Sequence, residues 1–143
     1  MITKLEVDEL MNMAKEAIRT TKLYWFENER YDEQVISVGG PHLTFCLSLS
    51  RNPHEIRAHF RIKGSNIQLA RIDNHNQHWN PDGEVLQGPH LHYFREGYDL
   101  IPWAEEIDWY DLSDPIGTLS KFLDIIHTRF PHGVDLPRQG SLF

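Results

Sequence analysis

The chain has 143 residues, of which 40% are hydrophobic and 24% charged, and its formal net charge is −7 at pH 7. This composition is that of an ordinary globular protein and excludes a low-complexity chain, while the negative charge argues against a general nucleic-acid coat protein. The single cysteine, Cys46, excludes an internal disulfide framework, and no apolar run approaches the roughly 20 residues that a membrane span needs.

The same totals predict how the chain is organised. We expect one domain over residues 1–143, because no change of composition marks a linker. We expect a cytoplasmic protein without a membrane partner, because the N-terminus MITKLEVDEL lacks the apolar core of a secretory signal. Residues 51–98 contain six basic and five acidic side chains, whereas the two ends of the chain are acidic. The middle of the chain can therefore hold a local anion site.

Residues 4–19 are predicted to form an amphipathic helix. Its apolar residues recur at three- and four-residue spacing, as Val7, Leu10, Met11, Ala14, Ala17 and Ile18. Thr3 followed by Glu6 has the form of a capping box, which predicts that the helix begins here.

After this helix the apolar pattern changes to the alternation that is typical of strands. Six strands are expected, at residues 23–27, 34–38, 42–50, 55–63, 67–73 and 88–95. The polar residues 28–33 suit a hairpin loop between the first two strands, and the short polar turns between the next three predict an antiparallel meander. Cys46 lies in an apolar run and is expected to fill the core.

The rest of the chain predicts a second helix over residues 115–129, with Asp114 as its N-cap. Residues 99–109 have no clean period and predict a short extended piece or an irregular link, and residues 131–143 predict a surface tail. The fold class is therefore α+β: an N-terminal helix, about six mainly antiparallel strands forming a curved sheet or open barrel, and a C-terminal helix, with the helices covering one face.

One predicted strand has a wholly basic face. Arg57, His59 and Arg61 alternate along residues 55–63, so their side chains point to the same side of the sheet. Guanidinium groups that flank an imidazole can hold a phosphate while the imidazole moves a proton. A solvated strand face that only keeps the protein soluble is the alternative interpretation of the same residues.

The stretch from His75 to Tyr98 concentrates titratable and aromatic side chains around the turn Asn80-Pro81-Asp82-Gly83. His90 and His92 are two residues apart in a predicted strand and can offer two ligands to one metal. Together with Glu96 they resemble the metal motif of the cupin barrels, although the further strands that a cupin needs do not follow. The alternative prediction here is a site for zinc or another divalent metal that uses His78, His90, His92 and Glu96.

A resemblance of wider extent rests on the turn Asn80–Gly83, on His90-Leu91-His92 and on Arg95-Glu96-Gly97-Tyr98. In these residues the chain resembles a small, uncharacterised bacterial family that is often found near mobile elements. The resemblance implies that this stretch is the functional centre, and it implies no activity.

The main functional prediction is a phosphate-directed site on the concave sheet face, in a metal-independent endoribonuclease or phosphodiesterase of the toxin type, with RNA as the partner. The acid–base candidates are His59, His90 and His92. The candidates for holding phosphate or stacking on bases are Arg57, Arg61, Arg95, Trp79, Tyr93 and Tyr98. Besides the metal-binding alternative, a third hypothesis is a non-enzymatic acidic protein that binds or inhibits a protein partner.

Three structural expectations follow from these hypotheses. His90 and His92 should be at least partly accessible to solvent and face the same side of one strand. The repeated tetrapeptide Gly-Pro-His-Leu at residues 40–43 and 88–91 should place His42 and His90 at equivalent strand starts. The turn Asn80–Gly83 should position the histidines relative to each other rather than contact a substrate.

Overall fold

The computed structural model describes residues 2–40, 42–65, 67–75, 77–98 and 100–138. The helices are α1 (Lys4–Asn12) and α2 (Pro115–Ile125). The strands are β1 (Lys15–Ala17), β2 (Leu23–Tyr24), β3 (Arg30–Ser37), β4 (Thr44–Asn52), β5 (Glu55–Ile62), β6 (Gln68–Asp73), β7 (Gln77–Trp79), β8 (Val85–Gln87), β9 (His90–Tyr93), β10 (Ala104–Glu106), β11 (Thr128–Arg129) and β12 (Val134–Asp135).

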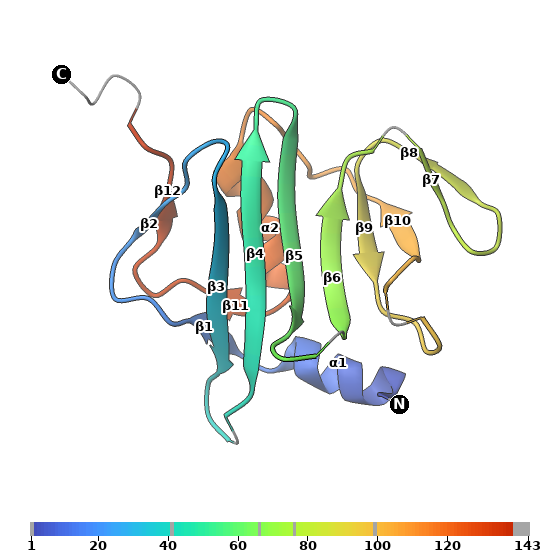
Figure 1. Ribbon diagram of the computed structural model, residues 1–143, viewed down its shortest axis with the longest axis horizontal. Helices are drawn as coiled ribbons and strands as arrows, with labels where there is room; N and C mark the ends of the chain where they lie inside the picture. The colour runs from blue at the N-terminus through green and yellow to red at the C-terminus, as the bar shows by residue number, and fades with distance from the viewer. Residues whose placement is uncertain (1, 41, 66, 76, 99, 139–143) are drawn as a thin grey trace.

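A mostly antiparallel sheet forms the body of the molecule, with the strand order β10-β9-β6-β5-β4-β3-β1-β11 (Figure 1). Only β1 and β11 pair in parallel within this sheet. Its two edges, β10 and β11, do not meet, so the sheet is open and is not a closed barrel. The predicted α+β class is therefore confirmed in its coarse form. Neither helix of the described residues is long and apolar enough to cross a membrane.

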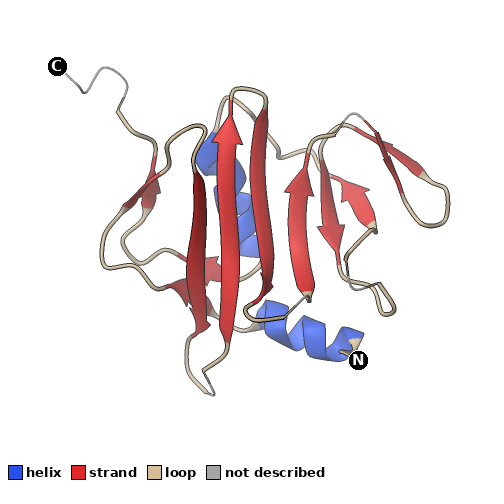
Figure 2. Ribbon diagram, in the orientation of Figure 1, coloured by secondary structure: helices blue, strands red, loops and turns tan. Residues whose placement is uncertain are grey.

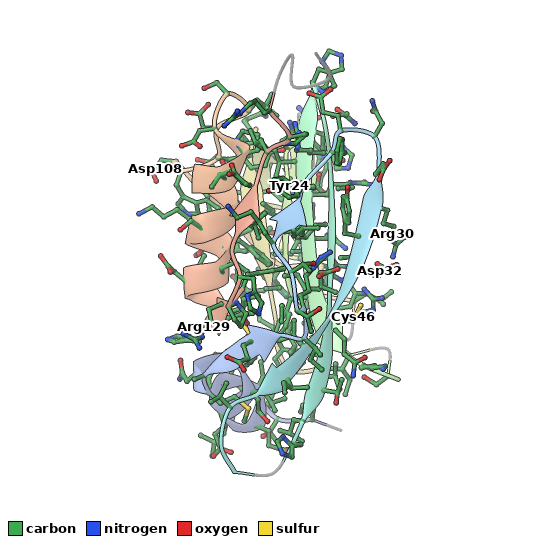
Figure 3. All side chains as sticks on the ribbon, turned by 90° about the vertical axis from the view of Figure 1, so that its left-hand side faces the viewer. Tyr24, Arg30, Asp32, Cys46, Asp108 and Arg129 are labelled. Carbon is green, nitrogen blue, oxygen red and sulfur yellow. The ribbon has the colours of Figure 1, made fainter. Side chains whose placement is uncertain are left out.

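The two faces of the sheet differ in chemistry because polar and apolar residues alternate along its long strands. One face is packed on α2, which lies behind the sheet in Figures 1 and 2, and the fully buried side chains of this layer include Phe45, Leu47, Phe60 and Phe122. The opposite face, called the polar face below, points away from α2. Figure 3 shows it edge-on, with Arg30 and Asp32 on the side away from the helix.

The helix starts are as predicted, but both helices end early. Thr3 and Glu6 form both hydrogen bonds of the capping box, and the Asp114 side chain accepts from Gly117 N at the start of α2. α1 ends at Asn12 rather than residue 19, because the chain turns extended at Met13 and residues 15–17 pair with β3 as β1. Ala17, which was predicted to continue the apolar stripe of the helix, lies in β1 instead.

The meander of β4, β5 and β6 is confirmed, whereas the first predicted hairpin is wrong. β3 already begins at Arg30, inside the expected loop, and pairs with β1 and β4. β2 instead pairs in parallel with β12, which lies within the predicted tail. Of the two alternatives predicted for residues 99–109, the short extended piece is found: it is β10, which pairs with β9. Residues 139–143 of the predicted tail lie outside the described residues.

Two smaller predictions are also wrong. His90 begins β9, whereas His42 is exposed and precedes β4, so the repeated tetrapeptide does not mark equivalent strand starts. Cys46 is half-buried on the polar face and is not part of the core, because Phe45 and Leu47 on either side of it point toward α2.

Candidate functional site

A row of polar side chains crosses five neighbouring strands of the polar face. The strand registers pair Asp32 with Ser48, Ser48 with His59, His59 with Arg71, and Arg71 with His92. Residues that pair directly point to the same side of a sheet. His59 and the β9 histidines therefore lie on one face, which is the condition that a shared site requires.

A cavity of about 460 Å³ opens on this face above β3 to β6. We call it the sheet-face cavity. Its polar lining residues are Arg30, Ser48, Ser50, Arg57, His59, Arg71, Asp73 and His75. The volume falls within the range of about 300–1,000 Å³ that is usual for small-molecule sites.

The arginines of the cavity differ in how their charge is balanced. Arg30 pairs with Asp32 at 3.0 Å, and Arg57 contacts the Glu55 carboxylate. Arg71 has no ion pair within 4 Å among the described residues, and its buried Nε has no hydrogen-bond partner among them. Burial lowers the pKa of Arg71. Arg71 therefore brings the least compensated positive charge to the cavity.

His59 lies at the floor of the cavity among these cations. Its Nε2 lies 2.9 Å from Gln68 Oε1, and because a carbonyl oxygen only accepts, Nε2 carries the proton and Nδ1 is left as the basic nitrogen. Burial, followed by the positive charges of Arg71, Arg61 and Arg30, lowers the pKa of His59 to about 4. The imidazole is neutral at pH 7, and the local potential around it is positive.

Ser48 connects two charged groups on the same face. Its hydroxyl donates to Asp32 Oδ1 at 2.6 Å and accepts from Arg61 Nη1 at 3.0 Å. The hydrogen bond from Ser48 is the largest cause of a lowered pKa at Asp32. Arg61 is thus held beside the cavity but does not line it.

Next to the cavity, His78 from β7 and His90 and His92 from β9 form the three-histidine cluster. Their ring centroids are 4.7–4.9 Å apart, and one ring nitrogen of each lies within 4.8 Å of the others. The β7–β8 hairpin brings His78 here, because Asn80 hydrogen-bonds both backbone groups of Ala104 on β10. Ala104 in turn pairs with His92.

The expectation about solvent access is half right. His90 and His92 face the same side of β9, but their exposed fractions are only 0% and 2%, so the predicted accessibility is wrong. The β7–β8 hairpin, which was not predicted from the sequence, covers both rings: His78 stacks on His90 and meets His92 edge-on. Burial lowers the pKa of His92 to about 3 and also lowers the pKa of His90, so both are neutral at pH 7.

The other predicted site residues lie apart from the cavity. Trp79 is exposed on the outer hairpin. Tyr93 points to the face opposite His92 and lines a second cavity of about 360 Å³. Arg95 and Tyr98 both pack on Trp103, at 4.0 Å and 6.0 Å from its ring centroid.

Glu96 does not join the three-histidine cluster. It is exposed, and its Oε1 accepts from Lys4 N at 2.6 Å. Of the four residues in the predicted metal set, the structure therefore brings together only His78, His90 and His92.

Several residues of the site were missed from the sequence. Arg30 was assigned to a loop, and Arg71, Ser48 and Asp73 were not singled out, although each falls on the polar phase of an alternating strand. The alternation of polar and apolar residues along these strands was the feature of the sequence that could have identified them. Which strands are neighbours could not be read from it, because pairing is a tertiary property.

Fold and site together define the class of protein: an open-sheet α+β protein that carries a cationic cavity and a three-histidine cluster on one sheet face. A family model described as "Family of unknown function (DUF6978)" matches residues 2–128, and the chain belongs to this family. No curated protein and no solved structure matches the chain. The expected resemblance to an uncharacterised family is thus confirmed at the level of the family, without bearing on the Asn80–Gly83 segment in particular.

Proposed function

We propose that the protein binds a phosphodiester in the sheet-face cavity and cleaves it, with single-stranded RNA as the substrate class. One observation carries the proposal: His59 lies at the floor of a cavity of about 460 Å³ that Arg30, Arg57 and Arg71 also line. On a chain with a net charge of −7, this grouping of guanidinium groups around one imidazole favours a local anion site.

The balance of charge supports an anionic ligand. Arg30 and Arg57 can each exchange a carboxylate partner for a phosphate oxygen, because both arginine side chains are more than half exposed. Arg71 has no carboxylate partner within 4 Å among the described residues, and its Nη2 lies 3.3 Å from His92 Nε2. A guanidinium that needs no rearrangement before binding loses little conformational entropy when it binds.

The proposed chemistry begins at His59. Its Nδ1 accepts the proton of the ribose 2′-hydroxyl, whose oxygen bonds to the adjacent phosphorus while the bond from phosphorus to the 5′ oxygen breaks. His75 lines the same cavity and supplies the proton that the leaving 5′ oxygen takes up. The products are a 2′,3′-cyclic phosphate and a 5′-hydroxyl, and the arginines stabilise the negative charge of the transition state.

This assignment differs from the sequence prediction in its acid–base pair. His59 is kept, and His75 takes the place of His90 and His92, because His90 and His92 are buried and do not line the cavity. A bound phosphate also raises the pKa of His59 from its value of about 4, because its negative charge favours the imidazolium. Substrate binding therefore makes His59 a stronger base than it is in the free protein.

The experiment separates binding from cleavage. A short single-stranded RNA is incubated with the protein in the presence of EDTA, and products are identified by mass. The all-deoxy version of the same oligonucleotide lacks the attacking hydroxyl, so it measures binding alone. We expect a cyclic phosphate product, a rate at least 100-fold lower for His59→Gln with unchanged affinity for the deoxy strand, and an affinity about 10-fold lower for Arg57→Gln.

Arg129→Gln is the matched control, because Arg129 is also an exposed arginine that pairs with a glutamate, at 3.2 Å from Glu16. It should leave both rate and affinity unchanged. Equal affinity of the wild type and of Arg57→Gln for the deoxy strand, together with no cyclic product, would contradict the proposal. That result would favour the non-enzymatic interaction protein.

A further inference from the structure

The three-histidine cluster has a pattern of hydrogen bonds that fixes the tautomer of every ring. His78 Nε2 lies 2.7 Å from Pro102 O, His90 Nδ1 lies 2.9 Å from Gly88 O, and His92 Nδ1 lies 2.8 Å from Ile101 O. Since carbonyl oxygens can only accept, each of these nitrogens carries a hydrogen. The lone pairs are left on His78 Nδ1, His90 Nε2 and His92 Nε2.

Two of these lone pairs, those of His90 Nε2 and His92 Nε2, lack a hydrogen-bond donor in line with them in the part of the chain that the structure describes. His90 is 0% exposed, and its Nε2 has no hydrogen-bond partner among the described residues. Arg71 Nη2 lies 3.4 Å and 3.3 Å from the two nitrogens of His92, and this near-equality places it over the ring rather than in line with the Nε2 lone pair. Buried polar atoms without a partner are rare and need an explanation, and a bound ion is one that suits an imidazole lone pair facing two further histidines.

We infer that His78, His90 and His92 bind one transition-metal ion, with zinc as the best-matched metal. Three neutral imidazoles suit Zn²⁺, and metal-bound histidines usually donate their second nitrogen to a carbonyl or carboxylate, as all three rings do here. Three protein ligands leave a fourth position for water or a further ligand. The inference does not depend on whether the neighbouring cavity binds a phosphodiester.

The alternative is that three neutral rings merely pack together. Packing alone would gain by turning an N–H of one ring toward a lone pair of another, but the carbonyl hydrogen bonds hold the donors on the outer side of the cluster. One ring nitrogen of each histidine lies within 4.8 Å of one in each of the other two rings. Zinc bonds of about 2.0–2.1 Å need ligand nitrogens roughly 3.4 Å apart. Metal binding therefore draws the β7–β8 hairpin, which carries His78, toward β9.

Titration of the metal-stripped, full-length protein tests the inference directly. After EDTA treatment and buffer exchange, Zn²⁺ is added in a calorimeter and Co²⁺ in a spectrophotometer. We expect one ion per chain, visible absorption bands of low-coordinate Co²⁺, and a rise in melting temperature with Zn²⁺. Trp79 adjoins His78, so amide exchange and tryptophan emission of the hairpin should also change on binding.

His78→Gln and His90→Gln should each lower the affinity at least 10-fold and remove the cobalt bands. His42→Gln is the matched control for His90→Gln, because His42 has the same Gly-Pro-His-Leu context but is exposed and outside the cluster. His78 is only half-buried, so His78→Gln keeps the test valid if His90→Gln unfolds. No stoichiometric binding to the folded wild type, or equal affinity for wild type and His78→Gln, would overturn the inference.

Discussion

At the scale of single residues, Lys15 is a charged residue that is buried in the fold, although lysines are usually exposed. It is 1% exposed, and its ammonium donates to Met11 O, Met13 O and Ile126 O at 2.7–3.0 Å. These carbonyls lie at the C-terminal ends of α1 and α2, where the helix dipoles favour a cation. Burial lowers the pKa of Lys15 to about 8, so the group is still charged at pH 7. One lysine thus joins the ends of both helices.

Replacing Lys15 should therefore destabilise the whole protein. Lys15→Met keeps most of the length of the side chain but removes the ammonium that donates to three buried or part-buried carbonyls, and we expect a loss on the order of 2–4 kcal/mol in the free energy of unfolding. Urea denaturation measures it. Lys22→Met is the control, since Lys22 is exposed and its single ion pair, with Asp135, is long at 3.8 Å. It should change stability by less than about 0.5 kcal/mol. Equal effects of the two substitutions would contradict this account.

His59 gives a second test at the residue scale. Its pKa of about 4 in the free protein should rise when inorganic phosphate binds, because the dominant nearby charges, those of arginines, are then partly neutralised. NMR titration of the ring proton follows both values in one sample. His132 is exposed and does not line the cavity, so its ring proton serves as the internal reference for chemical shift. A His59 titration that phosphate leaves unchanged would remove the cavity from consideration as a phosphate site.

At the scale of elements, the β7–β8 hairpin completes the three-histidine cluster, because it places His78 beside His90 and His92. Its turn closes with Gly83 N donating to Asn80 O at 2.8 Å, and Gly83 has a φ of 91°. Glycine reaches this region without the strain that a side chain adds. Asn80 then ties the turn to β10, whose Ala104 pairs with His92, so His78 is held beside His92. That the turn positions the histidines rather than contacting a substrate stays a prediction.

Gly83→Val should cost about 1–2 kcal/mol of stability through backbone strain alone, because nothing lies within 4 Å of an added Cβ. It should also weaken the binding of Zn²⁺ by displacing His78. Gly64→Val is a matched control, with a φ of 77° and equally open surroundings in the β5–β6 turn. It should lose similar stability without loss of metal affinity. Identical metal affinity in the two variants would show that the hairpin turn is only a connector.

Asn80→Asp examines the attachment of the same hairpin. The change removes the Nδ2 donor to Ala104 O, a 3.0 Å bond, and directs a carboxylate oxygen at that carbonyl. We expect a loss of about 2–3 kcal/mol and faster amide exchange over residues 77–87. Asp82→Asn is the control, because an asparagine oxygen can still accept from Glu84 N. Unchanged exchange in Asn80→Asp would mean that other contacts hold the hairpin.

At the scale of the whole molecule, the fold places apolar residues on one face of the sheet and basic residues and histidines on the other. The helix-covered side carries the core, and the opposite sheet face gathers arginines and three buried or half-buried histidines with lowered pKa values. These imidazoles are neutral in the folded state but become protonated near pH 6.5 in the unfolded chain. The unfolded state therefore binds more protons below that pH, and stability must fall as the solution is acidified.

We expect stability to be nearly constant between about pH 8 and pH 6.5 and to decline between about pH 6.5 and pH 4, as the histidines of the unfolded chain gain protons. Urea midpoints across this range measure the decline. His59→Gln should make it shallower, because it removes one of the three imidazoles whose pKa is lowered. A midpoint that stays constant through this range in the wild type would contradict the lowered pKa values.

The amino-acid sequence by itself determined the features that depend on local chemistry. The alternation along residues 44–50 and 55–62 defined two strands and their faces, and Thr3, Glu6 and Asp114 marked where both helices begin. Each of these signals acts over a few residues through hydrogen bonds or side-chain direction. The basic face of Arg57, His59 and Arg61 could be predicted for the same reason.

Only the tertiary structure decided which of these faces meet. The β1 strand, the parallel pairs of β1 with β11 and β2 with β12, and the docking of the β7–β8 hairpin all join segments with no local signal for each other. Strand pairing depends on burying the common apolar layer against α2, which involves the whole chain at once. That packing buried His90 and His92 and brought Arg71 beside His59, which no spacing in the sequence records.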